Sequence, residues 1–227
     1  MVMNNKFLFG IFLHKYKKVI IFAFYIALTA CNVSTKGNNS QFVIPESWIT
    51  YTVCDNYCSI SVPSTLELRN EDDYYTRHLP YEYDPSVNVF QQKGLANTEL
   101  PNVDEHYCRV MMSYYIGDKG DFPSPTEEFA FNDYYAIFDE LVDAQTGDYY
   151  SLLEAPTYRW IDIGNKNKAI EINYRRTGNK GNVTNGTIYL LCNRDILVQM
   201  VVAYRESEAE LWLPDVQNVI YTFKWEK

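Results

Sequence analysis

The chain has 227 residues, of which 47% are hydrophobic, 16% aromatic and 22% charged. This composition excludes a disordered, collagen-like or coiled-coil protein and indicates an ordinary globular chain. The formal net charge is −9, although the first thirty residues contribute four Lys and no acid. The remaining chain is therefore strongly acidic and repels phosphate backbones, so we expect no nucleic-acid partner.

The first thirty residues predict a secretory signal. An apolar run over residues 7–13 is followed by a basic cluster over 14–18 and by twelve uncharged, mostly apolar residues over 19–30. Twelve residues are too few to cross about 30 Å of hydrocarbon as a helix. A basic region followed by a short apolar region is typical of a signal peptide, here residues 1–30. A membrane helix that begins at Phe7 is the alternative, and the basic cluster argues against it.

The end of this segment, Leu-Thr-Ala-Cys at residues 28–31, resembles a bacterial lipobox. In such signals the cysteine is lipidated on sulfur, cleavage precedes it, and it becomes the first residue of the mature chain. The resemblance implies a membrane anchor on Cys31. Residues 31–44 then form a flexible tether, because they are rich in small polar residues. No acidic stretch follows Cys31, so we expect a lipid-anchored protein of the bacterial outer membrane that faces the periplasm.

Four cysteines, Cys54, Cys58, Cys108 and Cys192, follow in a compartment that tolerates disulfides. Four cysteines allow three pairings, and the sequence does not choose among them. Cys54 and Cys58 flank a short turn, so a local disulfide between them is feasible. Cys108 and Cys192 fall on the apolar faces of predicted strands, where buried free thiols are the simpler interpretation.

Alternation of apolar and polar residues dominates the rest of the chain. Cys108, Val110 and Met112 alternate with Arg109 and Ser113, which predicts a half-buried strand. Turn-forming residues separate the later strands, so we expect an antiparallel meander with one solvent-exposed face. The predicted strands are residues 48–53, 57–62, 87–92, 107–116, 169–176, 187–192 and 196–205.

Two helices interrupt these strands. Ser124 and Glu127 form a capping box around a proline at the first helical position, and a helical stripe of apolar residues follows. A second helix is expected to start at Ser207, with a kink or a restart at Pro214. Two helices beside an antiparallel sheet define an α+β fold, which we assign to one domain over residues 45–227.

Residues 59–69, 89–95 and 219–225 carry a strand followed by proline, a strand followed by a turn, and a helix end that leads into Thr-Phe-Lys-Trp. These segments resemble uncharacterised lipoproteins of Bacteroides-type bacteria, which are similar in turn to proteins of the Mog1/PsbP-like fold. The resemblance implies an α/β/α sandwich, an antiparallel sheet flanked by two main helices. It transfers no catalytic residue, and the better-known members of the family are non-catalytic adaptors or assembly factors.

Residues suited to catalysis or metal binding are scarce. Asp104, Glu105, His106 and Cys108 are four ligand types within five residues. Alternate residues of a strand point to opposite faces, however, so a solvated acidic loop is the simpler interpretation. The sequence contains no signature of serine hydrolases, phosphate-binding loops or zinc peptidases. We therefore expect no catalytic residue, no metal and no cofactor.

Tyrosine is the unusual feature of the composition, with 20 residues against 16 of leucine. Several tyrosines occur beside acidic residues, among them Tyr74, Tyr75, Tyr81 and Tyr83. A tyrosine ring combines a flat apolar face with a hydroxyl at low entropic cost, which suits the recognition of sugars or peptides. We take these four as candidate ligand-binding residues. The alternative is that their rings pack over sheet edges.

The sequence thus predicts a lipid-anchored envelope lipoprotein that acts as a non-catalytic binding, accessory or assembly module. Its partner would be an envelope protein or a glycan. Two alternatives stay open. One is a hydrolase that acts on envelope or glycan material, which requires a cleft lined by acidic groups. The other is a structural envelope protein that pairs with its partner through an exposed sheet edge.

Overall fold

The computed structural model describes residues 42–69, 86–93, 106–132, 134–147, 150–178 and 181–226. The predicted signal peptide, Cys31 and most of the predicted tether lie outside these ranges. The candidate binding residues Tyr74, Tyr75, Tyr81 and Tyr83 also lie outside them. What the sequence predicts for these residues stays a prediction.

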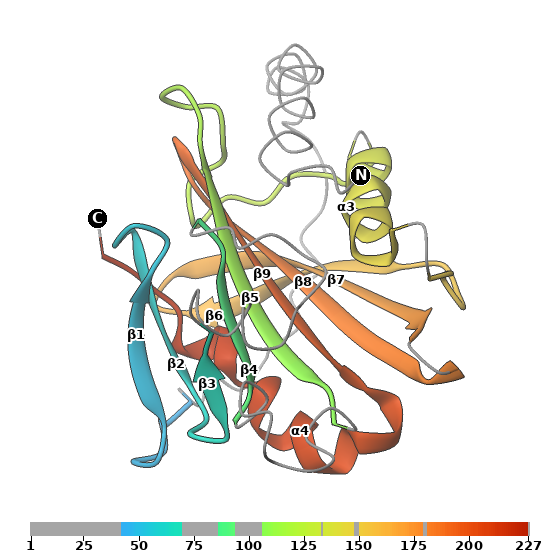
Figure 1. The fold of residues 1–227 in the computed structure, drawn as a ribbon. Coiled ribbons are helices and arrows are strands. Elements are labelled where there is room, and N and C mark those ends of the chain that lie inside the picture. Colours follow the sequence, from blue (N-terminus) through green and yellow to red (C-terminus); the bar gives the residue numbers. More distant parts are fainter. Residues whose placement is uncertain are drawn as a thin grey trace.

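A seven-stranded antiparallel sheet forms the centre of the fold (Figure 1). The strands β6 to β9 follow one another as a meander, and β5 lies beside β9. The order across the sheet is β3-β4-β5-β9-β8-β7-β6. The strands are β3 (Leu66–Leu68), β4 (Asn88–Gln92), β5 (Cys108–Ile116), β6 (Thr157–Gly164), β7 (Asn167–Thr177), β8 (Val183–Asn193) and β9 (Ile196–Arg205).

A smaller sheet contains the remaining strands, β1 (Ile49–Val53), β2 (Cys58–Val62) and β10 (Lys224–Trp225). Its order is β1-β2-β10, so the C-terminal end of the described chain returns to pair with the first hairpin. All strands predicted from alternation are confirmed, with small shifts at their ends. Strands β3 and β6 were not predicted, and the short strand β10 lies in the Thr-Phe-Lys-Trp segment that follows the last predicted helix.

The turn between β1 and β2 is attached to the large sheet. Its residues Cys54, Asp55 and Asn56 have φ angles of 53°, 51° and 66°. Aspartate and asparagine tolerate this left-handed conformation better than most residues. The hydroxyl of Tyr114 on β5 donates a hydrogen bond to the Asp55 carboxylate, and this bond together with burial raises the pKa of Tyr114 to about 12.

Helix α3 (Tyr135–Thr146) begins after the predicted capping box and not at it. The Ser124 N–H does donate to the Glu127 carboxylate at 2.8 Å, but this contact closes a single turn. The carbonyl of Pro125 accepts a hydrogen bond from the backbone of β7, and the Phe129 carbonyl accepts one from the Trp160 indole at 3.1 Å. Because strands of the sheet use these carbonyls, tertiary contacts override the local helix signal.

The second predicted helix is divided into three parts. The 3-10 turn η3 (Glu206–Glu208) leads into α4 (Ala209–Val216), which contains Pro214, and a second 3-10 turn, η4 (Val219–Thr222), follows. The side chain of Leu211 in α4 is 58% exposed, whereas Trp212 and Val216 are buried.

Both faces of the large sheet are buried, so the single exposed face predicted for the meander is wrong. In β9 the consecutive residues from Gln199 to Ala203 are all buried. The reason is that α3 covers one face, while the small sheet, α4 and η4 cover the other (Figure 1). The layering is therefore α/β/α only in part, because the second outer layer combines strands with helical turns.

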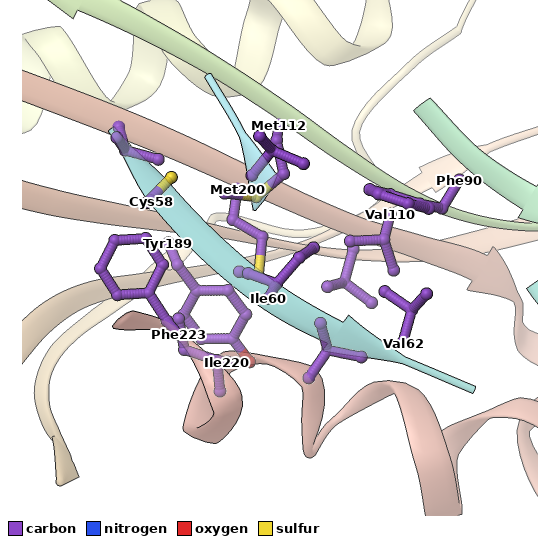
Figure 2. Close-up of a cluster of buried hydrophobic side chains, with 14 of the residues drawn as sticks. Cys58, Ile60, Val62, Phe90, Val110, Met112, Tyr189, Met200, Ile220 and Phe223 are labelled. Atoms are coloured by element: carbon purple, nitrogen blue, oxygen red, sulfur yellow. The ribbon is translucent and has the colours of Figure 1, made fainter. Parts of the chain in front are cut away.

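The central strands contribute to both cores, but in different proportions. The core between the sheets receives the alternating apolar residues of β5 and β9, together with side chains of β2 such as Cys58, Ile60 and Val62 (Figure 2). Ile220 and Phe223 close this core from the C-terminal segment (Figure 2). The core under α3 instead receives the alternating apolar residues of β7 and β8. The same alternation pattern therefore points to opposite sides of the sheet in different strands.

A buried hydroxyl connects the C-terminal segment to β2. The side-chain oxygen of Thr222 accepts a hydrogen bond from the Ser61 N–H at 2.8 Å and lies 2.7 Å from the Val219 carbonyl oxygen, to which it donates. Thr222 is 3% exposed, so water does not replace these partners.

Thr222→Val removes this hydroxyl at nearly constant volume and leaves the Ser61 N–H buried without an acceptor. We expect the free energy of unfolding to fall by about 1–3 kcal/mol, measured by urea denaturation. Thr157→Val, on the exposed start of β6, is the matched control and is expected to change it by less than about 0.5 kcal/mol. Equal stabilities of the two variants would contradict this role of Thr222.

Candidate functional site

The two cysteines of the predicted local pair lie together at the turn of the first hairpin. Cys54 and Cys58 are free thiols in this structure, 1% and 0% exposed. The thiol of Cys58 is hydrogen-bonded to the Cys54 side chain, and this bond together with burial raises the pKa of Cys58. The thiolate is the reactive form of cysteine, so a buried thiol of raised pKa is a poor nucleophile. A disulfide between the two residues stays a prediction.

The segment around His106 has a structural role. One carboxylate, that of Glu208, accepts hydrogen bonds from the Tyr107 N–H at 3.1 Å and from the Trp212 indole at 2.8 Å. His106 Nδ1 lies 3.3 Å from the same carboxylate. Glu208 thereby joins the start of β5 to α4. Within the described ranges, no group of three or more His, Cys, Asp and Glu residues is arranged to hold a metal ion.

A hollow with a volume of about 680 Å³ opens between α3 and the chain that leads into β6. We call it the tyrosine–aspartate hollow, because two tyrosines and two aspartates are the polar residues of its lining. It is a depression open to solvent and not an enclosed cavity. Its lining residues are Tyr135, Asp139, Asp143, Leu152, Ala155, Pro156 and Tyr158.

One side of the hollow is a stripe of α3. Tyr135, Asp139 and Asp143 follow one another at intervals of four residues, which places them on the same side of the helix. The apolar stripe of α3, which includes Phe138 and Val142, is buried against the sheet. Burial of this stripe fixes the rotation of the helix, and so it holds the polar stripe toward the hollow.

Tyr158 of β6 forms the opposite side. Its ring centroid lies 5.3 Å from that of Tyr135 and 5.4 Å from that of Phe138. Its hydroxyl donates a hydrogen bond to the Asp139 carboxylate. Burial, and then this hydrogen bond and the charge of Asp139, raise the pKa of Tyr158 above the usual value of a phenol. Tyr158 is therefore protonated at neutral pH and holds a carboxylate beside two aromatic rings.

The third side is fixed to the sheet. Leu152 and Pro156 belong to the segment before β6, which continues the edge of the sheet along β7. Leu152 forms an isolated antiparallel bridge with Arg176, and the Leu153 N–H donates to the Arg175 carbonyl at 2.9 Å. Two sides of the hollow are thus a helix and a strand, and the third is an irregular segment attached to β7, which favours a preformed binding surface.

The carboxylates of the hollow do not serve the stability of α3. Like charges four residues apart, such as Asp139 and Asp143, destabilise a helix by about 0.2–0.5 kcal/mol. Asp143 also lies in the last turn, where the helix dipole favours basic side chains, and α3 has none there. Residues that oppose local stability are expected at functional sites, which makes this pair a candidate for binding.

Some residues of this site could have been recognised from the sequence. The spacing of Tyr135, Asp139 and Asp143 could be read from a predicted helix. Tyr158 could not be placed, because β6 was not predicted, although Tyr158 and Trp160 alternate with Arg159 as in the other strands. The contact between α3 and β6 depends on tertiary structure alone.

No model of a protein family and no curated protein matches this chain. Among solved structures, the chain is similar to a protein of Bacteroides thetaiotaomicron, with 12% identity over 78% of this chain and a TM-score of 0.41. The match covers 48% of that protein, so this chain spans about half of its length.

Two further similar structures are the cyanobacterial PsbP protein (CyanoP) of Synechocystis and a variant of Mog1. CyanoP has 16% identity over 87% of this chain and 98% of its own, with a TM-score of 0.47. Mog1 has 9% identity over 79% and 96%, with a TM-score of 0.41. The similar structures thus include both proteins after which the implied fold is named. Similarity at this level concerns the course of the chain and carries no information on ligands, partners or anchoring.

The raised pKa of Tyr158 predicts a change of stability with pH. A phenol whose pKa is higher in the folded than in the unfolded state stabilises the fold below about pH 10, and this contribution is lost as the pH rises toward the folded pKa. We expect Tyr158→Phe to lose less stability than the wild type between about pH 9 and pH 11, measured by urea denaturation. Tyr135→Phe, which removes the other hydroxyl of the hollow, is the control. Parallel profiles of Tyr158→Phe and the wild type would contradict the assignment.

Proposed function

We propose that the protein is a lipid-anchored envelope protein that binds a partner through the tyrosine–aspartate hollow and acts as an accessory module. The observation that carries this proposal is the hollow itself. Two exposed carboxylates, Asp139 and Asp143, lie beside the rings of Tyr135 and Tyr158 on a surface formed by α3, β6 and the segment attached to β7. A binding surface of this composition needs no reacting group.

The chemistry of the hollow selects a cationic group. A carboxylate forms strong, charge-assisted hydrogen bonds with ammonium and guanidinium groups. The face of a tyrosine ring attracts the same cations through its quadrupole. Leu152 and Pro156 add apolar surface for the aliphatic part of such a side chain. We therefore propose a partner that offers amino or guanidinium groups, either an envelope protein or an amino-bearing glycan.

The anchor is the second part of the proposal. Its support is the lipobox-like Leu-Thr-Ala-Cys at residues 28–31, after a basic and then an apolar segment. A lipid on Cys31 and the tether after it would hold the domain at the outer membrane, facing the periplasm. In the described part of the chain, no helix has the length and apolar character needed to span a bilayer.

Replacement of Cys31 tests the anchor directly. We expect Cys31→Ala to lose incorporation of radiolabelled palmitate and to move from the membrane fraction to the soluble fraction of cells. Cys192→Ala, which removes a different cysteine, is the matched control and should keep both properties. Labelling that persists in Cys31→Ala would contradict lipidation at this residue.

Replacement of the carboxylates tests the hollow. We expect the double variant Asp139→Asn/Asp143→Asn to lose the partner that crosslinking in native membranes, followed by affinity capture and mass spectrometry, recovers with the wild type. Glu46→Gln/Glu210→Gln makes the same change of net charge at exposed positions away from the hollow, so it is the matched control. Loss of the partner in both double variants would indicate a general effect of charge.

The same experiment includes the tyrosines predicted from the sequence. Tyr74, Tyr75, Tyr81 and Tyr83, replaced together by alanine, form a separate arm. Loss of the partner in this arm, with retention in Asp139→Asn/Asp143→Asn, would contradict the hollow and favour the tyrosine-rich segment as the binding surface.

A further inference from the structure

A second group of polar side chains lies on the α3-facing side of the large sheet, at the ends of the strands nearest α4 (Figure 1). The strand register aligns one row of residues across β4, β5, β9, β8 and β7. Directly opposed residues of neighbouring strands share a face of the sheet. The row consists of Gln91, Arg109, Ala203, Gly186 and Tyr174.

Tyr174 lies across β8 in this row. A Cβ on Gly186 would be 2.0 Å from the ring Cζ of Tyr174 and 2.4 Å from its hydroxyl oxygen. The ring therefore fills the space above Gly186, and its hydroxyl lies over β8 with the small Ala203 next in the row. Tyr174 is 3% exposed, and its hydroxyl is hydrogen-bonded to the side chain of Arg176.

Arg176 lies beside this hydroxyl, and Arg109 belongs to the same row two strands away from Gly186. Arg176 is 8% exposed, its guanidinium lies 4.3 Å from the ring centroid of Tyr150, and its Nη1 donates to the Thr177 carbonyl at 3.0 Å. The guanidinium of Arg109 lies 5.3 Å from the ring centroid of Tyr107. The Nε of each arginine is buried without a hydrogen-bond acceptor.

Among the described residues, no carboxylate forms an ion pair with either of these two arginines. Guanidinium stays ionised at any relevant pH, and a buried charge is costly unless it is paired. In the described part of the chain, the ion pairs of arginine involve Arg159, Arg175 and Arg205. Arg109 and Arg176 contact tyrosine rings and neutral oxygens instead. An anion between them would supply both the missing charge and the missing acceptor.

We propose that Arg109, Tyr174 and Arg176 form a binding site for a small oxyanion, a phosphate or carboxylate group. Guanidinium presents parallel donors that match such groups, and ring stacking holds its plane in place. Neighbouring strands lie about 4.8 Å apart, so the backbone of Arg109 is about two strand spacings from that of Gly186. The long side chain of Arg109 can therefore reach an anion at the Tyr174 hydroxyl.

Oxyanion binding to the full-length protein in detergent tests the proposal. Inorganic phosphate and acetate are titrated separately at constant ionic strength, with chloride as the reference, and the thermal unfolding midpoint and the heat of binding are recorded. We expect at least one of the two anions to raise the midpoint above its value in chloride. Arg109→Gln and Arg176→Gln should each weaken that binding about ten-fold or more. The anion that binds more tightly shows whether the site prefers a phosphate group or a carboxylate group.

Two further variants keep the test decisive. Arg175→Gln removes the neighbouring arginine, which pairs with Glu206 on the opposite face of the sheet, and should bind the anion like the wild type. Tyr174→Phe keeps the ring over Gly186 and removes only the hydroxyl. It should weaken binding even if the arginine variants fail to fold.

The proposal is overturned if neither anion raises the unfolding midpoint above its value in chloride. It is also overturned if the arginine variants and Tyr174→Phe all bind the anion like the wild type. The double variant Asp139→Asn/Asp143→Asn should bind the oxyanion normally, because the hollow has a different lining. Failure of this site is therefore distinguishable from failure of the proposed function.

Discussion

The rest of the structure depends on the burial of both faces of the large sheet. Each central strand sends alternate side chains into two different cores, one under α3 and one under the small sheet. A sheet buried on both faces leaves little of its own surface for binding. The tyrosine–aspartate hollow accordingly lies at the edge of the sheet, between α3 and the start of β6, and the arginine–tyrosine group lies at the ends of the strands.

Several tyrosines lie at the borders between these cores and the polar surface. A phenol packs its ring among apolar groups and keeps a hydrogen-bonding tip, so it suits positions where a core ends. Tyr158 does so at the hollow, Tyr174 at the arginines, and Tyr114 at the turn of the first hairpin. In each case the hydroxyl contacts a charged side chain. For the described residues, the tyrosine-rich composition thus has a structural account beside the proposed recognition of partners.

The two candidate sites have opposite charge in an acidic protein with a formal net charge of −9. The exposed carboxylates of the hollow act together with the net charge to attract cations. The arginines act against it, because Arg176 is buried and the Nε of Arg109 is buried, so these groups are largely removed from solvent. A domain of this kind can hold a cationic partner on one side of α3 and an oxyanion at the sheet end without competition between them.

The sequence by itself determined most of the strands, although not β3 and β6, because alternation of side chains is a local property, and it indicated that two helical segments interrupt them. It also held the four-residue spacing of Tyr135, Asp139 and Asp143. Only the tertiary structure decided which core each alternating set enters, because the same pattern fits either face of a sheet. It also converted the capping box at Ser124 into a turn, since β6 and β7 bind the carbonyls that a helix would use. The contact of Tyr158 with α3 arises where distant segments meet, and no local pattern encodes it, whereas Tyr174 and Arg176 share one face of β7 through strand alternation itself.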